Sequence, residues 1–355
     1  MRSIFIGSTG GEPGQTLATW ALAIRLREKG LRVGFFKPYG LLPQVGTAPR
    51  GAFCDSDVLL LKQFLNLSAS DESLCPITLP EKNFTPEMAG GLGVQLMEKI
   101  QEAFREISRD KDVVLIMGAK EIFFGGGGDS GLSDSHLAKL FDTSVLLVDR
   151  YQRDNLTFYS LLSLNSFLDG RVKTAILNHV APDRLDHIKA KVVPFLKEKG
   201  LKSVVAVPED PILAGLTVST IAELTEGKIL CCPELEGNLV HTSTIGSNCL
   251  EGPLSIFKQV YNKIILVGLD PTGAEGKPVV GIILTGGKNP SELVLKAAKD
   301  RSVPLILTRA DTFQVMERLE KARPALRLND EFKVRRFLQL IDQGMGPNRW
   351  VEDLL

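Results

Sequence analysis

The sequence has no net charge, few cysteines and histidines, and no long apolar run. Its 42 basic and 42 acidic residues cancel, so no global field attracts nucleic acid or an anionic membrane, and we expect neither as a partner. Five cysteines without CxxC spacing and only four histidines argue against a disulfide framework and a zinc site. No apolar run approaches the roughly 18 to 20 residues of a membrane span, and the N-terminus lacks a signal-peptide layout. We expect a soluble, cytoplasmic protein.

Short apolar runs rich in Ile, Val and Phe recur through the first 210 residues and predict the strands of one sheet. They lie at residues 4–6, 33–36, 113–116, 145–148, 174–177 and 204–207. Predicted helices separate them, for example at residues 16–29, 133–141 and 183–199. Such alternation is typical of an α/β fold with a mainly parallel sheet flanked by helices, whose ligands bind at the carboxyl ends of the strands.

The pattern changes at the prolines of VPEDP, residues 207–211, which read as a linker. Beyond them a second α/β cycle begins, with predicted strands at 264–267, 279–284 and 304–307 and predicted helices at 217–225, 291–299, 311–321 and 331–343. A chain of 355 residues is long enough for two domains. We expect a first domain over 1–210, a smaller α/β domain over 211–345 and a C-terminal tail over 346–355.

A glycine-rich segment, GSTGGEPGQT, joins the first predicted strand to the first predicted helix. Gly10, Gly11 and Gly14 would let backbone N–H groups approach a phosphate at the helix N-terminus, and Thr16 supplies a hydroxyl for magnesium. Gln15, however, stands where a phosphate loop has Lys, and only three residues separate Gly10 from Gly14. Loss of one preorganised charge-stabilising group costs about 3 to 4 kcal/mol of transition-state stabilisation. A turn that binds nothing is the alternative.

The surroundings of this loop resemble the dethiobiotin synthetase and cobyrinate diamide synthetase group of phosphate-loop enzymes. In FFKPYG, Lys37 takes the place of a lysine that faces substrate and phosphate in that group, which makes it the catalytic candidate if the site is active. In CDSD, Asp55 and Asp57 match an acidic segment that helps to hold magnesium. The resemblance therefore implies a magnesium site formed by Thr16, Asp55 and Asp57.

Two later segments look like the adenine-pocket elements of the same group. In ILNHV, the resemblance has Asn178 contacting the base. In VPEDP, the residues that line the pocket are Pro208, Glu209 and Asp210. The implied ligand is ATP or ADP with magnesium, bound by these residues together with Gly10, Gly11, Gly14, Gln15 and Thr16.

One departure from the family pattern lies after the third central strand. The family has an acidic residue there that completes magnesium binding, whereas VVLIMGAKE places Met117 at that position. A thioether is a poor ligand for a hard cation, which prefers oxygen. Glu121 lies four residues later and is an alternative ligand. Together with Gln15, this replacement favours a degenerate site without hydrolysis.

The second predicted unit resembles the DRTGG domain, whose motif is matched by Asp-Pro-Thr-Gly at residues 270–273. Pro271 replaces the arginine of the motif, which removes a cation. A dethiobiotin-synthetase-like domain followed by a DRTGG domain resembles the N-terminal regulatory part of long bacterial phosphotransacetylases, and this pair also occurs in free-standing proteins. Because the sequence ends soon after this unit, we expect no acetyltransferase domain and no acetyl transfer.

The segment LTGGKNPSE, residues 284–292, offers a glycine turn, a lysine and a helix start that suit an anion. A plain strand, turn and helix with an exposed lysine is the alternative. The candidates for a ligand crevice or a dimer contact in this domain are Asp270, Thr272, Thr285, Gly286 and Gly287.

Three functions follow from these observations. We favour a regulatory or ligand-sensing protein rather than an enzyme, which forms a homo-oligomer and binds an adenine nucleotide at a degenerate site. The first alternative is an ATP-dependent ligase of the dethiobiotin synthetase or cobyrinate amidase-ligase type, in which Lys37 supplies the missing charge. The second alternative is a scaffold that binds no nucleotide.

Overall fold

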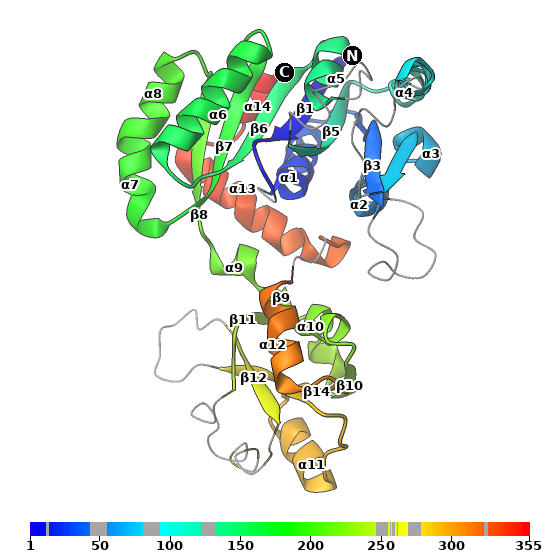
Figure 1. Cartoon of the computed structure of the whole chain (residues 1–355), viewed down its shortest axis with the longest axis vertical. Coiled ribbons are helices and arrows are strands. Elements are labelled where there is room, and N and C mark those ends of the chain that lie inside the picture. Colours follow the sequence, from blue (N-terminus) through cyan, green and yellow to red (C-terminus); the bar gives the residue numbers. More distant parts are fainter. Residues whose placement is uncertain are drawn as a thin grey trace. The chain divides into compact units, whose positions relative to one another are not determined.

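The structure is a computed structural model that describes residues 1–11, 14–42, 55–80, 93–121, 133–245, 255, 257, 260, 262–268, 278–322 and 326–355. Two compact units are present (Figure 1). The first contains Met1–Glu209 and Ala325–Leu355, and the second contains Asp210–Pro324. Each unit has its own six-stranded sheet.

The sheet of the first unit has the order β2-β5-β1-β6-β7-β8, and every neighbouring pair is parallel. Its strands are β1 (Arg2–Ser8), β2 (Val33–Phe36), β5 (Val113–Glu121), β6 (Ser144–Arg150), β7 (Val172–Val180) and β8 (Ser203–Pro208). Each contains one of the predicted apolar runs, so the expected parallel α/β sheet is confirmed. The chain moves to opposite sides of β1 in going to β2 and to β6, which places the topological switch point at the carboxyl end of β1.

Helices flank this sheet, and a separate pair of short parallel strands, β3 (Tyr39–Leu42) and β4 (Ile77–Pro80), follows β2 (Figure 1). The helices and helical turns are α1 (Gln15–Glu28), α2 (Ser56–Leu65), α3 (Asp71–Leu74), α4 (Gly93–Ile107), α5 (Asp134–Leu140), α6 (Asp154–Phe167), η2 (Pro182–Arg184), α7 (Leu185–His187), η3 (Ile188–Val192), α8 (Val193–Glu198), α13 (Glu331–Met345) and α14 (Arg349–Leu354). Residues of α1 are buried on most sides, as expected for a helix enclosed by other elements.

The C-terminal helices belong to the first unit, in contrast to the expected boundaries of 211–345 and 346–355. The buried face of α13 includes Phe337 and Ile341, and this helix contacts α1 and β8. Thr174 of β7 donates a hydrogen bond to the backbone oxygen of Trp350 in α14 at 3.2 Å. An amphipathic helix packs wherever an apolar surface is open to it, and here that surface is the first sheet.

The second unit has a mixed sheet with the order β10-β14-β13-β12-β11-β9. Its elements are α9 (Pro211–Ala214), β9 (Leu216–Thr217), α10 (Val218–Leu224), β10 (Lys228–Cys231), η4 (Pro233–Leu235), β11 (Leu239–Thr244), β12 (Lys263–Gly268), β13 (Val279–Leu284), α11 (Glu292–Asp300), β14 (Leu305–Leu307) and α12 (Thr312–Glu320). The short turn η6 (Leu328–Asp330) follows in sequence and belongs to the first unit. The pair β13 and β14 is parallel, while the other neighbours are antiparallel. Two buried apolar clusters form the core of the unit.

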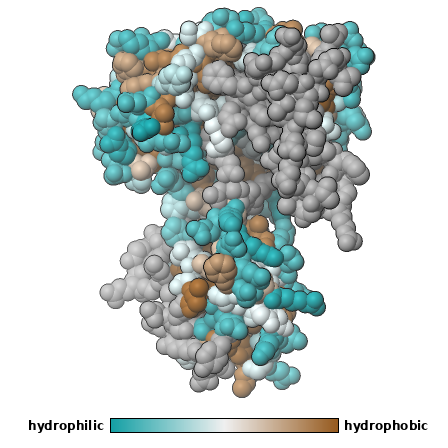
Figure 2. Space-filling model, viewed as in Figure 1, coloured by the Kyte–Doolittle hydropathy of each residue, from teal (hydrophilic) through white to brown (hydrophobic). Residues whose placement is uncertain are grey.

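The described surface is mainly hydrophilic on the face shown in Figure 2, with separated apolar areas. Large exposed apolar side chains include Tyr159 in the first unit and Phe313 in the second, and single exposures of this kind are ordinary in folded proteins. Among the described helices, not one combines the length and hydropathy that a membrane span requires.

Candidate functional site

The glycine loop follows β1 at the switch point of the first sheet and leads directly into α1. Gly14, the N-cap residue of α1, has φ 96° in the left-handed region, which glycine adopts without strain. Gly10 and Gly11 precede it and have open space around their Cα atoms. The glycine-rich backbone expected at a phosphate loop is therefore present in this turn.

The N-terminus of α1 differs from those of several other described helices because no side chain caps it. Gly14 provides no side-chain hydrogen bond, and the first turn contains no acidic residue. By contrast, side chains cap α2, α5, α10, α11 and α12 through Asp55, Ser133, Thr217, Ser291 and Asp311. The first N–H groups of a helix have no partner within the helix, and the dipole there favours negative charge. This helix end is thus suited to an anion.

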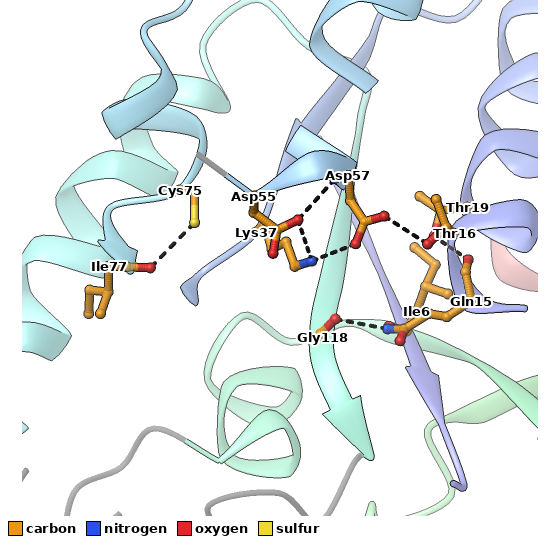
Figure 3. A network of polar contacts seen from close by, with 10 residues as sticks. All are labelled: Ile6, Gln15, Thr16, Thr19, Lys37, Asp55, Asp57, Cys75, Ile77 and Gly118. Atoms are coloured by element: carbon orange, nitrogen blue, oxygen red, sulfur yellow. Dashed lines mark hydrogen bonds and ion pairs between the residues drawn. The ribbon is translucent and has the colours of Figure 1, made fainter. Parts of the chain in front are cut away.

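Gln15 uses its side chain within the protein. The buried amide nitrogen Nε2 donates hydrogen bonds to the backbone oxygens of Ile6, at 2.7 Å, and Gly118, at 3.0 Å (Figure 3). An amide carries two N–H donors, and both are accounted for. The side chain therefore joins β1 to β5 instead of donating to a phosphate, and only the backbone N–H of Gln15 would be left for that role.

Four predicted residues from three separate segments meet beside the first turn of α1 (Figure 3). Lys37, which follows β2 and is 3% exposed, donates from Nζ to Asp55 Oδ1 at 2.8 Å and to Asp57 Oδ2 at 2.6 Å. Thr16 donates from its hydroxyl to Asp57 Oδ1 at 2.8 Å. The backbone N–H of Asp57 donates to Asp55 Oδ1 at 3.0 Å because Asp55 caps α2. We call these four residues the lysine cluster.

Charge pairing in the lysine cluster outweighs burial for two of its members. Burial lowers the pKa of Lys37, but the negative charges of Asp57 and Asp55 raise that pKa above its ordinary value. Burial raises the pKa of Asp57, but the charge and the hydrogen bond of Lys37 lower that pKa below its ordinary value. For Asp55, burial dominates and raises the pKa. Lys37 and Asp57 are therefore ionised at neutral pH.

The lysine cluster contains the three expected magnesium ligands, but its arrangement does not fit a magnesium ion. Hydroxyl and carboxylate oxygens have the right chemistry for this metal. The ammonium of Lys37, however, already bridges the carboxylates of Asp55 and Asp57. Among the residues that the structure describes, no group of three His, Cys, Asp or Glu side chains is placed to hold a metal.

The structure brings Asn178, the residue that the resemblance has contacting the base, to the glycine loop. Asn178 lies in β7 and is buried, and its Nδ2 is 2.7 Å from the point that a Cβ on Gly14 would occupy. Pro208 pairs with Val180 at the ends of β8 and β7. The backbone N–H of Glu209 donates to the oxygen of Val180 at 2.8 Å.

Asp210 has a local structural role. Its Oδ1 accepts from the backbone N–H groups of Ile212, at 3.0 Å, and Leu213, at 3.3 Å. It thereby caps α9, at the start of the second unit. The capping bonds account for the carboxylate in VPEDP without a nucleotide.

Two buried carboxylates at the strand ends were not identified from the sequence. Asp134 in α5 accepts a hydrogen bond from the Tyr39 hydroxyl at 2.8 Å, and its Oδ2 lies 2.0 Å from the point that a Cβ on Gly118 would occupy. Burial and the charge of Asp134 raise the pKa of Tyr39 well above its ordinary value. A carboxylate thus lies against Gly118 of β5, the residue that follows the buried Met117. The alternative ligand Glu121 pairs with Ser8 in register.

Asp149 is the second of these carboxylates and lies at the carboxyl end of β6. It accepts hydrogen bonds from the hydroxyls of Thr9, in the glycine loop, and of Thr157, in α6, the latter at 2.9 Å. Its position directly after the predicted strand 145–148 was the sequence signal that could have identified it. The loop is therefore held by a neighbouring strand as well as by its own backbone.

The second unit keeps the glycine turn of LTGGKNPSE closed by its own contacts. The backbone N–H groups of Gly286 and Gly287 each donate at 2.9 Å, to the oxygens of Ala310 and Thr308. Thr285 donates to the oxygen of Asn262 at 3.0 Å. These bonds occupy the backbone N–H groups of both glycines, so those groups are not presented to an anion. Asp270 and Thr272 lie outside the described residues.

A cavity of about 350 Å³ lies away from the glycine loop. Its lining includes Arg2, Ser3 and Ser144, which belong to the amino ends of β1 and β6. Ligands of parallel α/β sheets bind at the opposite, carboxyl ends of the strands. The loop and the lysine cluster therefore remain the candidate site.

Two family models match the chain. An AAA domain matches residues 2–217, which is more than half of the 355 residues. The chain belongs to this AAA-domain family. A DRTGG domain matches residues 220–322. The matches confirm the predicted combination of a phosphate-loop domain with a DRTGG domain.

Curated relatives cover nearly all of the chain at low identity. The phosphate acetyltransferase of Synechocystis sp. (strain PCC 6803) is 21% identical over 365 residues, which cover 98% of this chain and 51% of that protein. The phosphate acetyltransferase of Pseudomonas aeruginosa is 20% identical, covering 96% of this chain and 50% of that protein. The chain spans about half the length of the curated relatives that it matches, and the predicted resemblance to phosphotransacetylases is confirmed.

Two solved structures align with the chain at low TM-scores. The septum site-determining protein MinD from Pyrococcus horikoshii, in complex with Mg-ADP, aligns with a TM-score of 0.35 at 16% identity over 60% of this chain and 83% of that chain. A nucleotide-binding protein from Archaeoglobus fulgidus, in complex with ADP, aligns with a TM-score of 0.33 at 14% identity over 59% of this chain and 82% of that chain. Scores this low do not establish a shared site.

Proposed function

We propose that this protein is regulatory and that its AAA domain binds an adenine nucleotide without transferring a phosphoryl group. The observation that carries the proposal is the uncapped N-terminus of α1 behind Gly14 at the switch point of the parallel sheet. An anion gains there from the first N–H groups of the helix, which have no partner within the helix itself, and from the helix dipole. Asn178, which the family resemblance places at the base, lies against the same glycine.

The side chains around this loop argue against phosphoryl transfer. Positioned charge provides most of the catalysis in that reaction class. The Gln15 amide is neutral and bonded to two backbone oxygens, while the Lys37 ammonium is held by two carboxylates. Neither group is presented to a transferring phosphate. Binding through the backbone would survive the loss of these charges better than catalysis would.

The relatives support a regulatory role in acetyl-phosphate metabolism. Almost the whole chain is similar to about half the length of each of two phosphate acetyltransferases. A DRTGG domain match follows the AAA domain match along the chain. We propose that the protein acts in the cytoplasm as a homo-oligomer and that nucleotide occupancy is the regulatory signal.

Calorimetric titration with ADP and ATP, with phosphate release followed in parallel, tests this function. Saturable binding without release of phosphate is the expected result. Release of phosphate that disappears in Lys37→Ala would favour the ATP-dependent ligase, because Lys37 would then act on the phosphate. No binding of either nucleotide would favour the scaffold.

A further inference from the structure

We infer that Lys37 takes the place of a divalent metal ion, so that this site binds its nucleotide without magnesium. The part of this inference that concerns nucleotide rests on the proposed function. The part that concerns the metal is independent of it, because it is read from the contacts of Lys37 alone.

Lys37 occupies the position between the two carboxylates where a metal would bind. Its Nζ lies 2.8 Å from Asp55 Oδ1 and 2.6 Å from Asp57 Oδ2. The same two carboxylates were the expected magnesium ligands, together with the Thr16 hydroxyl. Because the ammonium lies at hydrogen-bond distance from both, a cation cannot bridge these oxygens until the lysine leaves.

The remaining contacts of the lysine cluster hold this arrangement in place. Asp57 accepts from the hydroxyl of Thr16 at 2.8 Å, and Asp55 accepts from the N–H of Asp57 at 3.0 Å. Each carboxylate therefore has a protein donor in addition to the ammonium. Hydrogen-bonded charge pairs with further partners are the arrangement that stabilises buried charge.

Burial makes exchange of the lysine for magnesium unfavourable. The side chains of Lys37 and Asp55 are 3% and 8% exposed, and that of Asp57 is 19% exposed. An entering magnesium ion would have to lose water, which it does reluctantly. The displaced ammonium would have to find another buried partner or reach solvent. The lysine therefore acts as a permanent internal cation.

Binding of Mn²⁺, a spectroscopic substitute for magnesium, tests the metal part. Electron paramagnetic resonance of free Mn²⁺ is measured with the wild-type chain, with Lys37→Met and with Lys62→Met, a control that removes a lysine paired with Asp71 at the surface. We expect Mn²⁺ to stay free in the presence of the wild type and the control. The Mn²⁺ affinity of Lys37→Met should exceed that of the wild type at least about tenfold. Asp57→Asn, added to Lys37→Met, should abolish that binding.

Specific Mn²⁺ binding by the wild type that is lost in Thr16→Ala and in Asp57→Asn would overturn the inference. So would Mn²⁺ binding that appears only when ADP is present, because the lysine would then be displaced by nucleotide. These wild-type measurements decide the question even where Lys37→Met does not fold. If Lys37→Met folds only partly, a rise in its melting temperature with Mn²⁺, absent from the wild type, is the expected result.

Titration of the wild type with ADP in the presence of EDTA or magnesium tests the nucleotide part. We expect the two dissociation constants to agree within about twofold. A loss of binding in EDTA would overturn magnesium-free binding. Absence of ADP binding in both buffers would overturn the proposed function, whereas the Mn²⁺ result would still decide whether Lys37 replaces the metal.

Discussion

Asn178 lies directly against Gly14, with Nδ2 2.7 Å from the point that a Cβ on that glycine would occupy. The residue that the family resemblance assigns to the base thus lies against the glycine turn that we propose as the phosphate site. Because Gly14 also has φ 96°, both the backbone and the neighbour require glycine here. Nucleotide binding is expected to be sensitive to this single position.

Gly14→Ala should weaken ADP binding at least about tenfold, because the Cβ would strain the turn and press on Asn178. The left-handed backbone alone should lower the free energy of unfolding by about 1 to 2 kcal/mol. Calorimetry and urea denaturation measure the two effects.

Gly200→Ala is the matched control for that substitution. Gly200 has φ 104° and nothing within 4 Å of the point that its Cβ would occupy, so the strain should be similar and ADP affinity should be unchanged. Equal loss of ADP affinity in both variants would show that the turn at Gly14 has no special role.

Gln15→Ala should lower the free energy of unfolding by about 1 to 3 kcal/mol, because two buried carbonyl oxygens lose their donor. Gln15→Lys should retain more of that stability, since an ammonium can donate to the same oxygens of Ile6 and Gly118. Urea denaturation measures both, with the exposed Gln63→Ala as control. Equal stability of Gln15→Ala and the wild type would contradict the role assigned to this amide.

Tyr39 and Asp134 should be energetically coupled. A double-mutant cycle with Tyr39→Phe and Asp134→Ala should give a coupling free energy of about 1.5 to 3 kcal/mol, the range for hydrogen bonds to charged groups. The hydroxyl lies 2.8 Å from Asp134 Oδ1 and both side chains are buried. Additive effects of the two substitutions in urea denaturation would show that the hydrogen bond adds no stability.

Alkylation of Cys232 should be slow near neutral pH. Burial, together with the neighbouring Cys231, raises the pKa of the Cys232 thiol to about 11, and only the thiolate reacts. The alkylation rate of Cys232 should therefore keep rising up to about pH 11. The rate of an ordinary thiol, with a pKa of about 8.5, would have levelled off well below that pH. Mass spectrometry of the Cys232 peptide, with urea-unfolded chain as reference, measures this. A plateau near pH 9 in the folded protein would contradict the assigned environment.

Phe337→Ala should destabilise the first unit by about 3 to 5 kcal/mol, because this fully buried ring of α13 packs within that unit. Phe332→Ala, at a position of the same helix that is 39% exposed, should change stability by only about 0.5 kcal/mol. Urea denaturation followed by the buried Trp20, which lies in α1, reports on the first unit. Equal effects of the two substitutions would argue against the packing of α13 in this unit.

Local patterns sufficed to predict the six strands of the first sheet and several helices, but not the strands β3, β4, β9, β10 and β11. Apolar runs such as 4–6 and 145–148 lie within β1 and β6, and the predicted helix 133–141 contains α5, which Ser133 caps. The placement of α13 could not be predicted, because an amphipathic face shows that a helix is covered but not by which sheet. Residues 331–345 pack on elements that are far away in the sequence.

The four residues of the lysine cluster were predicted from the sequence, but their contacts with one another were not, and Asp134 and Asp149 were missed. Lys37, Asp55 and Asp57 were expected near Thr16, and the structure brings them together. The mutual ion pairs of these residues were not foreseen, since residue types alone do not show whether a lysine faces a ligand or a carboxylate. Gln15 likewise finds an acceptor at Gly118, 103 residues away.

Titration of the wild-type chain with ADP, combined with an assay for phosphate release from ATP, tests the proposed function most directly. We expect a saturable heat of ADP binding, equal in EDTA and magnesium, and no release of phosphate above the buffer rate. Absence of saturable ADP binding, or phosphate release that requires Lys37, would contradict the proposed function.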